Sequence, residues 1–138
     1  MNLLYSNDTL GQYPDSWYAA TTAPLAAFAP LDADIRADVC IIGAGYTGLS
    51  AALALAERGY DVVILEAQRV GFGASGRNGG QLGSGQNVDQ DKLERMMGAH
   101  DANQLWHLAE DAKDLVKTLI AQHRIDCHLK PGVAHMAL

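Results

Sequence analysis

The sequence predicts an α/β fold that contains a βαβ unit with a parallel sheet. Residues 38–43, DVCIIG, form an apolar run rich in β-branched side chains, which is typical of a parallel strand buried on both faces. Residues 61–66, DVVILE, repeat that composition and end on a carboxylate. Residues 47–58 are rich in alanine and leucine and stop at Gly59, so we expect a helix there. A strand, helix and strand within about 30 residues predict a crossover that leaves the strands parallel.

The chain on either side of this unit predicts an arm and two helices. Residues 1–37 hold three of the four prolines without sustained periodicity, which favours an extended arm over the domain surface, with a mobile leader as the alternative. Residues 89–98 predict a short helix, and residues 102–123 a long amphipathic helix with a capping box at Asp101 and Gln104. The apolar stripe of the long helix comprises Leu105, Leu108, Ala109, Ala112, Leu115, Val116, Leu119 and Ile120.

The end of the sequence predicts a further strand. Residues 133–138, VAHMAL, follow Pro131 and Gly132 and have the composition of a strand that starts and then stops. A βαβ unit by itself leaves both strand edges unpaired and rarely stands alone. We therefore expect an incomplete, truncated chain with three parts: the arm at 1–37, the βαβ unit with a glycine-rich loop at 38–88, and a helical segment with the start of a strand at 89–138.

Composition and charge exclude several classes of protein. Hydrophobic residues make up 49% and charged residues 19% of the 138 residues, which is globular composition and excludes disorder throughout. The formal net charge of −6 would repel a phosphate backbone, so we expect no nucleic-acid partner. Apolar runs break off well before the roughly 20 residues that a membrane-spanning helix needs, so we expect no membrane span.

The cysteines and the N-terminal residues predict a cytoplasmic location. Cys40 and Cys127 form neither a disulfide framework nor a CxxC metal pair, so we expect two buried free thiols in a reducing compartment. No lysine or arginine precedes Arg36, and the first residues lack the hydrophobic region of a secretory signal. The five histidines have no metal-ligand spacing, so we predict no metal site.

A glycine pattern lies where the first predicted strand meets the helix. Gly43, Gly45 and Gly48 form GxGxxG, in which the first glycine permits a tight turn, the second a close approach to a pyrophosphate, and the third close packing of helix on strand. Glu66 ends the second strand about 20 residues further on, where a carboxylate accepts hydrogen bonds from an adenosine ribose and would repel a 2′-phosphate. The pattern predicts a Rossmann-like site for FAD or NAD rather than NADP; the alternative is a glycine turn with a surface glutamate.

A second glycine-rich segment follows the second strand. Residues 71–85, GFGASGRNGGQLGSG, hold seven of the fourteen glycines, which is too many for a regular element. Such a loop suits a place where the main chain contacts a cofactor, and Ser75, Arg77 and Asn78 add polar groups that a plain spacer does not need. The alternative is a disordered surface loop.

The run from Gly43 to Gln81 resembles the FAD-dependent amine and amino-acid oxidases of the D-amino acid oxidase (DAO) superfamily. SWYAA at residues 16–20 together with GASGRNGGQ at residues 73–81 is most similar to the branch that oxidises γ-glutamylputrescine. The resemblance implies FAD as cofactor, a small-molecule amine as substrate and O2 as electron acceptor, with hydride transfer to the flavin, imine hydrolysis and release of hydrogen peroxide. Residues 133–138 would start a substrate-side strand, and the substrate-facing sheet and the stretch that closes the flavin site would lie beyond Leu138, so we nominate no catalytic residue.

The resemblance also implies which residues bind the cofactor. The fingerprint would hold the pyrophosphate, the residues after the second strand the adenosine half, and the glycine loop the ribityl chain and the flavin edge. In chain order these residues are Gly43, Ala44, Gly45, Tyr46, Thr47, Gly48, Glu66, Ala67, Arg69, Ala74, Ser75, Arg77, Asn78, Gly79, Gly80 and Gln81. Two alternatives stay open: an NAD-dependent dehydrogenase, which has no evident need of GASGRNGGQ, and a non-catalytic fragment.

Overall fold

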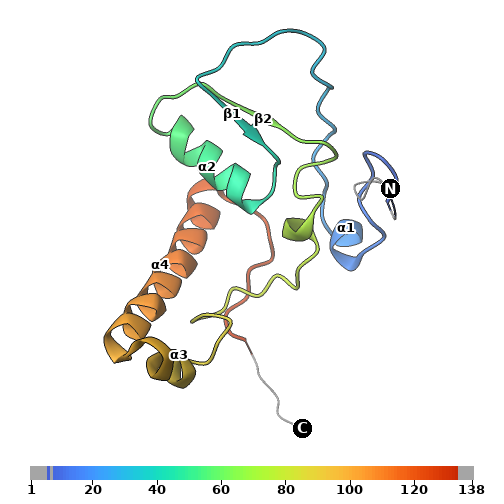
Figure 1. The fold of residues 1–138 in the computed structure, drawn as a ribbon. Coiled ribbons are helices and arrows are strands. Elements are labelled where there is room, and N and C mark those ends of the chain that lie inside the picture. Colours follow the sequence, from blue (N-terminus) through green and yellow to red (C-terminus); the bar gives the residue numbers. More distant parts are fainter. Residues whose placement is uncertain (1–5, 7, 134–138) are drawn as a thin grey trace. The chain divides into compact units, whose positions relative to one another are not determined.

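The computed structural model describes residue 6 and residues 8–133 of the chain (Figure 1). They form two compact units, one that ends at Gly79 and one that begins at Gly80. The helices and strands are α1 (Trp17–Thr21), β1 (Val39–Ile42), α2 (Tyr46–Ala56), β2 (Val62–Leu65), the 3₁₀ turn η1 (Ala74–Gly76), α3 (Gln90–Met97) and α4 (Ala99–His123). The domain boundaries expected after residues 37 and 88 stay predictions, and the strand expected at 133–138 lies, from residue 134 on, outside the described residues.

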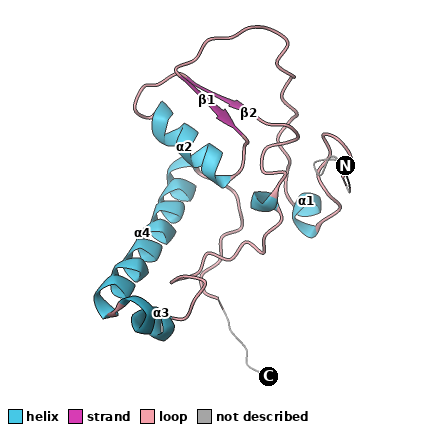
Figure 2. Ribbon diagram, in the orientation of Figure 1, coloured by secondary structure: helices cyan, strands magenta, loops and turns pink. Residues whose placement is uncertain are grey.

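β1, α2 and β2 form the βαβ unit that the sequence predicts (Figure 2). The two strands are parallel, with Val39 opposite Val62 at the start of the pairing. The helix ends at Ala56, two residues earlier than expected, and the turn that follows contains Gly59, which has a φ of +89° and whose amide donates to Ala56 O at 2.9 Å. The predicted α/β class with a partial Rossmann-like parallel sheet is confirmed.

The two strands are less buried than the sequence predicts. α2 packs against the sheet, and β1 alternates between half-buried and exposed positions, with Ile42 78% exposed. The expectation of strands buried on both faces is therefore wrong within the described residues, because such burial needs covering layers on both sides of a sheet. Cys40 on β1 and Cys127 are free thiols, as expected, but both are exposed rather than buried.

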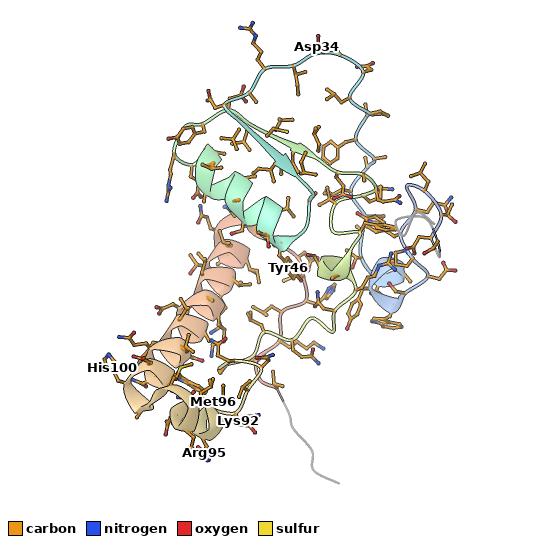
Figure 3. All side chains as sticks on the ribbon, viewed as in Figure 1. Asp34, Tyr46, Lys92, Arg95, Met96 and His100 are labelled. Carbon is orange, nitrogen blue, oxygen red and sulfur yellow. The ribbon has the colours of Figure 1, made fainter. Side chains whose placement is uncertain are left out.

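The arm contains one short helix that the sequence does not predict. α1 has five residues, and Ser16 Oγ caps it by accepting a hydrogen bond from Ala19 N at 3.2 Å. Residues 22–38 contain no helix or strand and pass Asp34, labelled in Figure 3, on the way to β1. The arm is extended over most of its described length, but not throughout.

α3 and α4 confirm the two predicted helices, but α4 begins earlier than predicted. Gly98, with a φ of +88°, donates to Glu94 O and accepts from Ala102 N, so it both ends α3 and begins α4. Asp101 consequently lies inside the first turn, no side chain caps α4, and the predicted capping box is wrong. Neither α4 nor any other helix in the described part of the chain is long and apolar enough to cross a membrane.

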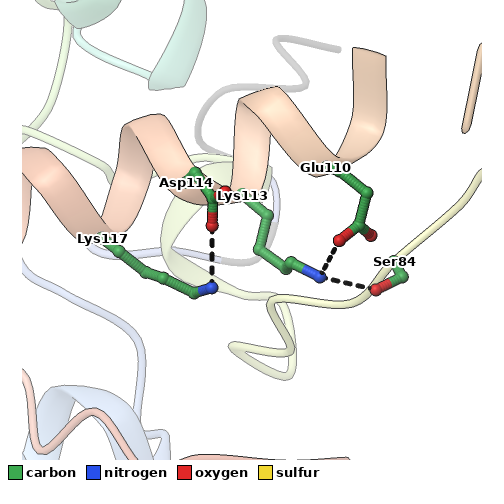
Figure 4. A network of polar contacts seen from close by, with 5 residues as sticks. All are labelled: Ser84, Glu110, Lys113, Asp114 and Lys117. Atoms are coloured by element: carbon green, nitrogen blue, oxygen red, sulfur yellow. Dashed lines mark hydrogen bonds and ion pairs between the residues drawn. The ribbon is translucent and has the colours of Figure 1, made fainter. Parts of the chain in front are cut away.

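α4 carries an apolar stripe and a set of ion pairs. Half of the predicted stripe is exposed, namely Leu108, Ala112, Leu115 and Val116. Lys113 Nζ donates to Glu110 Oε2 at 2.6 Å and to Ser84 Oγ at 2.7 Å, and Lys117 Nζ donates to Asp114 Oδ1 at 2.9 Å (Figure 4). The pKa of Glu110 is lowered, first by the hydrogen bond from Lys113 and then by the Ser84 hydroxyl, and Lys117 lowers the pKa of Asp114 in the same way. Short-range pairs therefore stabilise this solvated face.

Candidate dinucleotide-binding site

The first and third glycines of GxGxxG shape the turn between β1 and α2. Gly43 has a φ of +97°, which favours glycine, and its amide donates to Leu65 O at the end of β2 at 2.7 Å. A Cβ on Gly48 would lie 2.0 Å from Gly43 O and 3.3 Å from Ile41 Cγ2. A glycine at position 48 is therefore what lets the start of α2 lie this close to the end of β1.

Two backbone amides of this turn donate to side-chain oxygens. Ala44 N donates to Glu66 Oε2 at 2.7 Å, and Tyr46 N, in the first residue of α2, donates to Ser75 Oγ at 2.9 Å. Gly45, the N-cap of α2, has no side chain with which to cap the helix. The N-terminal end of α2 thus presents backbone donors to oxygen atoms at the positive end of the helix dipole, as an anion site does.

Glu66 faces the glycine turn from the end of β2. Its Oε2 accepts from Ala44 N, and its Oε1 accepts from Gln68 N at 2.9 Å. Each carboxylate oxygen has two acceptor positions, so a hydroxyl group can donate to Glu66 while both backbone bonds remain. The geometry therefore leaves room for the adenosine-ribose role expected of Glu66, and the neighbouring Ala67 is exposed.

The glycine loop folds back onto this turn and repeats its geometry. Gly71 has a φ of +71°, its amide donates to Ala44 O at 2.8 Å, and a Cβ on Gly76 would lie 2.2 Å from Gly71 O. Gly71 and Gly76 thus have the spacing and the close approach of Gly43 and Gly48. This repeated spacing is a signal in the sequence that the GxGxxG pattern does not include. The loop also contains η1, so the expectation of no regular element there is wrong.

Ser75 and Asn78 tie the loop to the start of α2. Ser75 Oγ lies 3.0 Å from the position that a Cβ on Gly45 would take. Asn78 Nδ2 donates to Ser75 O at 2.8 Å and to Tyr46 Oη at 3.1 Å. Tyr46 is 65% exposed and is labelled at the start of α2 in Figure 3. These polar groups border the end of α2 at which the pyrophosphate is expected.

The two arginines among the expected cofactor ligands contact the arm. Arg77 Nη2 pairs with Asp8 Oδ1 at 3.1 Å, and its guanidinium lies 4.7 Å from the centre of the Phe72 ring. Arg69 donates to two carbonyl groups of the arm. No sequence pattern indicates the contacts of Arg69, because its acceptors in the arm are backbone carbonyl oxygens, which any residue supplies.

The structure brings together part of the expected site. Within the first unit, the residues that lie on or border the turn are Gly43, Ala44, Gly45, Tyr46, Thr47, Gly48, Glu66, Ala74, Ser75 and Asn78. Gly80 and Gln81 belong to the second unit, so their contacts with the cofactor stay predictions, as does that of Gly79. No group of three or more metal-ligating side chains occurs among residues 6 and 8–133.

Comparisons with known proteins relate this site to flavoenzymes. The sequence matches the family described as FAD dependent oxidoreductase (DAO) over residues 38–138. It is 44% identical to gamma-glutamylputrescine oxidoreductase of Escherichia coli (strain K12) over 127 residues, which are 92% of this chain and 30% of that protein. It is 46% identical over 125 residues to a Rhizobium meliloti (strain 1021) protein named "Probable oxidoreductase OrdL", covering 88% of this chain and 29% of the relative. The chain thus spans about 30% of the length of these relatives, and no solved structure matches it.

Proposed function

Because the chain belongs to the family of FAD-dependent oxidoreductases (DAO), we propose that it holds the adenosine and diphosphate end of FAD in a flavin-dependent amine or amino-acid oxidase. Both relatives described above are named as oxidoreductases. The observation that carries the proposal for this chain is the pair of amides at the start of α2, Ala44 N and Tyr46 N, which already donate to oxygen atoms.

The residues of the turn fit a dinucleotide. Apart from its two chain neighbours, no described residue has an atom within 4 Å of the position that a Cβ on Gly43 would take, so this side of the turn is open to a ligand. Backbone donors at a helix N-terminus suit a diphosphate, and the carboxylate of Glu66 suits ribose hydroxyls. A phosphate oxygen that takes the amide of Tyr46 would replace Ser75 Oγ there, and the released hydroxyl could then donate to the phosphate.

The proposed reaction is the oxidation of a carbon–nitrogen bond in a small amine, for which bound FAD supplies the electron acceptor, O2 reoxidises the cofactor and hydrogen peroxide is released. The chain's own residues bind and orient: the glycine turn and Ser75 at the diphosphate, Glu66 at the ribose, and Asn78 on the flavin side. The proposed substrate is similar to γ-glutamylputrescine, because a relative named for it is 44% identical. We propose no catalytic base within the described residues.

An NAD-dependent dehydrogenase is the second candidate, because the GxGxxG turn and Glu66 suit NAD equally well. The family match over residues 38–138 favours FAD. So do Ser75 and Asn78, which border the start of α2 in a loop that an NAD site does not require.

We also propose a cytoplasmic location, which the free thiols of the two cysteines support.

Titration of the purified chain with FAD, followed by flavin fluorescence and repeated with NAD as competitor, tests the cofactor. We expect saturable FAD binding that NAD does not displace. Gly45→Val should abolish it, because the added Cβ would lie 3.0 Å from Ser75 Oγ and its methyl groups would fill the space of the pyrophosphate oxygens. Gly83→Ala is the matched control, since no described residue other than its chain neighbours has an atom within 4 Å of its Cβ position. Displacement by NAD, or a normal flavin content in Gly45→Val, would contradict the proposal.

A peroxide assay with γ-glutamylputrescine tests the reaction. We expect no turnover from residues 1–138 alone, because the chain spans about 30% of the length of the relatives and positioned reacting groups account for a large share of catalysis. A protein of the relatives' length that carries this chain is expected to release peroxide. Steady turnover by the short chain above a free-flavin control would show that the site is complete within it.

A further inference from the structure

The N-terminal arm is bonded to the segment that carries the ribose-binding carboxylate. We propose that Arg69 is the anchor of this arm and a positioning residue for the dinucleotide site, which acts by holding the arm on residues 66–70 rather than by contacting the adenosine half. The effect on FAD rests on the proposed function, whereas the anchoring itself does not. Figure 1 shows the arm with α1 beside the segment that follows β2.

The guanidinium of Arg69 joins two distant points of the arm. Its Nη1 donates to Gly11 O at 3.2 Å and its Nη2 donates to Leu25 O, while its Cζ lies 4.8 Å from the centre of the Tyr13 ring. A planar guanidinium presents its donors in a fixed fork and stacks on aromatic rings. One side chain therefore contacts the arm at Gly11 and Tyr13, before α1, and at Leu25, beyond α1.

The residues on either side of Arg69 bind the arm as well. Gln68 Oε1 accepts from Gly11 N at 2.7 Å, and Val70 O accepts from Tyr13 Oη at 2.8 Å. Three consecutive residues, 68–70, thus engage the arm through side chain or backbone. This concentration on one short segment distinguishes an attachment site from incidental surface contacts.

The same segment orients the carboxylate of the candidate site. Gln68 N donates to Glu66 Oε1 at 2.9 Å, and Glu66 Oε2 accepts from Ala44 N in the glycine turn. A path of hydrogen bonds therefore runs from Gly11 through Gln68 and Glu66 to the turn. An arm that is fixed before the cofactor arrives reduces the ordering that binding requires, which is the basis of preorganisation.

Polar contacts rather than apolar burial hold the arm. Its large apolar side chains are exposed, with Trp17 at 76%, Leu25 at 58% and Phe28 at 77%. The further ion pair of Asp8 with Arg77 joins partly exposed groups and contributes little by itself. Loss of the Arg69 guanidinium should therefore release the arm, since the single hydrogen bonds at Gln68 and Val70 would remain without an apolar core behind them.

Hydrogen–deuterium exchange on the cofactor-free protein tests the anchoring. In Arg69→Ala we expect residues 8–25 to exchange at the rate of an unstructured peptide, with β1 and α2 as protected as in the wild-type chain. Arg58→Ala, on the exposed end of the α2 segment, is the matched control and should leave the arm unchanged. Equal protection of the arm in Arg69→Ala and the wild-type chain would overturn the proposal, whether or not the protein binds FAD.

A double-variant cycle with FAD titration tests the positioning role. We expect Arg69→Ala and deletion of residues 1–25 each to weaken FAD binding about tenfold, and the two changes together to weaken it no further. If Arg69 contacts the adenosine half directly, the substitution will weaken binding again in the arm-deleted protein, which would overturn the proposal. Absence of FAD binding in the wild-type chain would refute the proposed function and leave the exchange result to decide the anchoring.

Discussion

Different kinds of contact stabilise the inside of each of the two units. In the first unit, side chains bind backbone groups far away in the sequence, as Glu66 does at Ala44 and Ser75 at Tyr46. In the described part of the second unit, both ion pairs join neighbours on α4, as Lys117 does with Asp114. The first unit is therefore organised around the ends of its helix and strands, where backbone groups lack partners, and the second around the helix itself.

Glycines in the chain are required for two different reasons. Gly48 and Gly76 lie where a Cβ would approach a carbonyl oxygen to 2.0 and 2.2 Å, so both are required by close packing. Gly98, between α3 and α4, has a φ of +88°, but no described residue other than its chain neighbours has an atom within 4 Å of its Cβ position. Gly48 and Gly76 are thus glycines for proximity and Gly98 is a glycine for backbone conformation, and substitutions at these positions should separate the two uses.

Gly48→Ala should have the largest effect. The added Cβ would lie 2.0 Å from a backbone oxygen that cannot move aside without displacing α2 from β1. We expect the free energy of unfolding of the first unit to fall by about 3 kcal/mol, the upper part of the range for overpacking. Denaturant unfolding followed by circular dichroism measures this. Gly83→Ala should leave stability unchanged, and an equal loss in both variants would show that the close approach has no energetic consequence.

Glu66→Gln should have the next largest effect. The amide group can accept at one oxygen only, so one of the two backbone donors, Ala44 N or Gln68 N, loses a charge-assisted bond. We expect the free energy of FAD binding to become less favourable by about 1.5–3 kcal/mol, as measured by flavin titration. Glu57→Gln at the exposed end of α2 is a control for the change in net charge. Unchanged affinity in Glu66→Gln would refute the ribose role.

Ala102→Leu tests how tightly α3 and α4 pack in the second unit. Ala102 is 0% exposed in the first turns of α4, so a larger side chain should destabilise the α3–α4 pair by about 1–3 kcal/mol. Leu108→Gln, at a position that is 61% exposed, should change stability by less than about 0.5 kcal/mol. Urea unfolding of both variants provides the test, and a larger loss for Leu108→Gln would mean that the stripe is covered in solution.

Acid should have the smallest effect and act on the second unit. The pKa of Glu110 lies below 4.5 because Lys113 and Ser84 bind the ionised form. A lowered pKa gives a stabilisation that is complete above the ordinary value and is lost as the pH falls through the lowered one. We expect helix stability to decline below about pH 4.5 less steeply in Glu110→Gln than in the wild-type chain, as measured by thermal unfolding at several pH values. Identical slopes would refute a contribution from this pair.

Much of the first unit could be predicted because its signals are local in the sequence. The apolar runs at 38–43 and 61–66 and the glycines between them predict strands, helix and parallel pairing, and the structure has all of these. The contacts of Arg69 could not be predicted, because its partners are carbonyl groups of Gly11 and Leu25 and no residue pattern marks a carbonyl acceptor.

The second unit shows where local patterns mislead. Asp101 and Gln104 have the spacing of a capping box, but Gly98 takes a positive φ and begins α4 before either residue can cap it. The burial expected for the strands and for Cys40 is also wrong. An apolar composition is typical of a buried strand, but it does not show whether helices cover both faces of the sheet. The cofactor roles of the site residues stay predictions that the experiments above address.

The paired glycines have a consequence for the gene as well as for the protein. Any codon change that replaces glycine by another amino acid adds at least a Cβ atom, so positions 48 and 76 have no conservative substitution. In a library that contains every single-residue variant of this chain, no substitution at position 48 or 76 should occur among the clones that retain the cofactor. Many substitutions at position 83 should occur among them. The two turns would then appear in the selection data as a pair of forbidden positions with identical spacing from Gly43 and from Gly71.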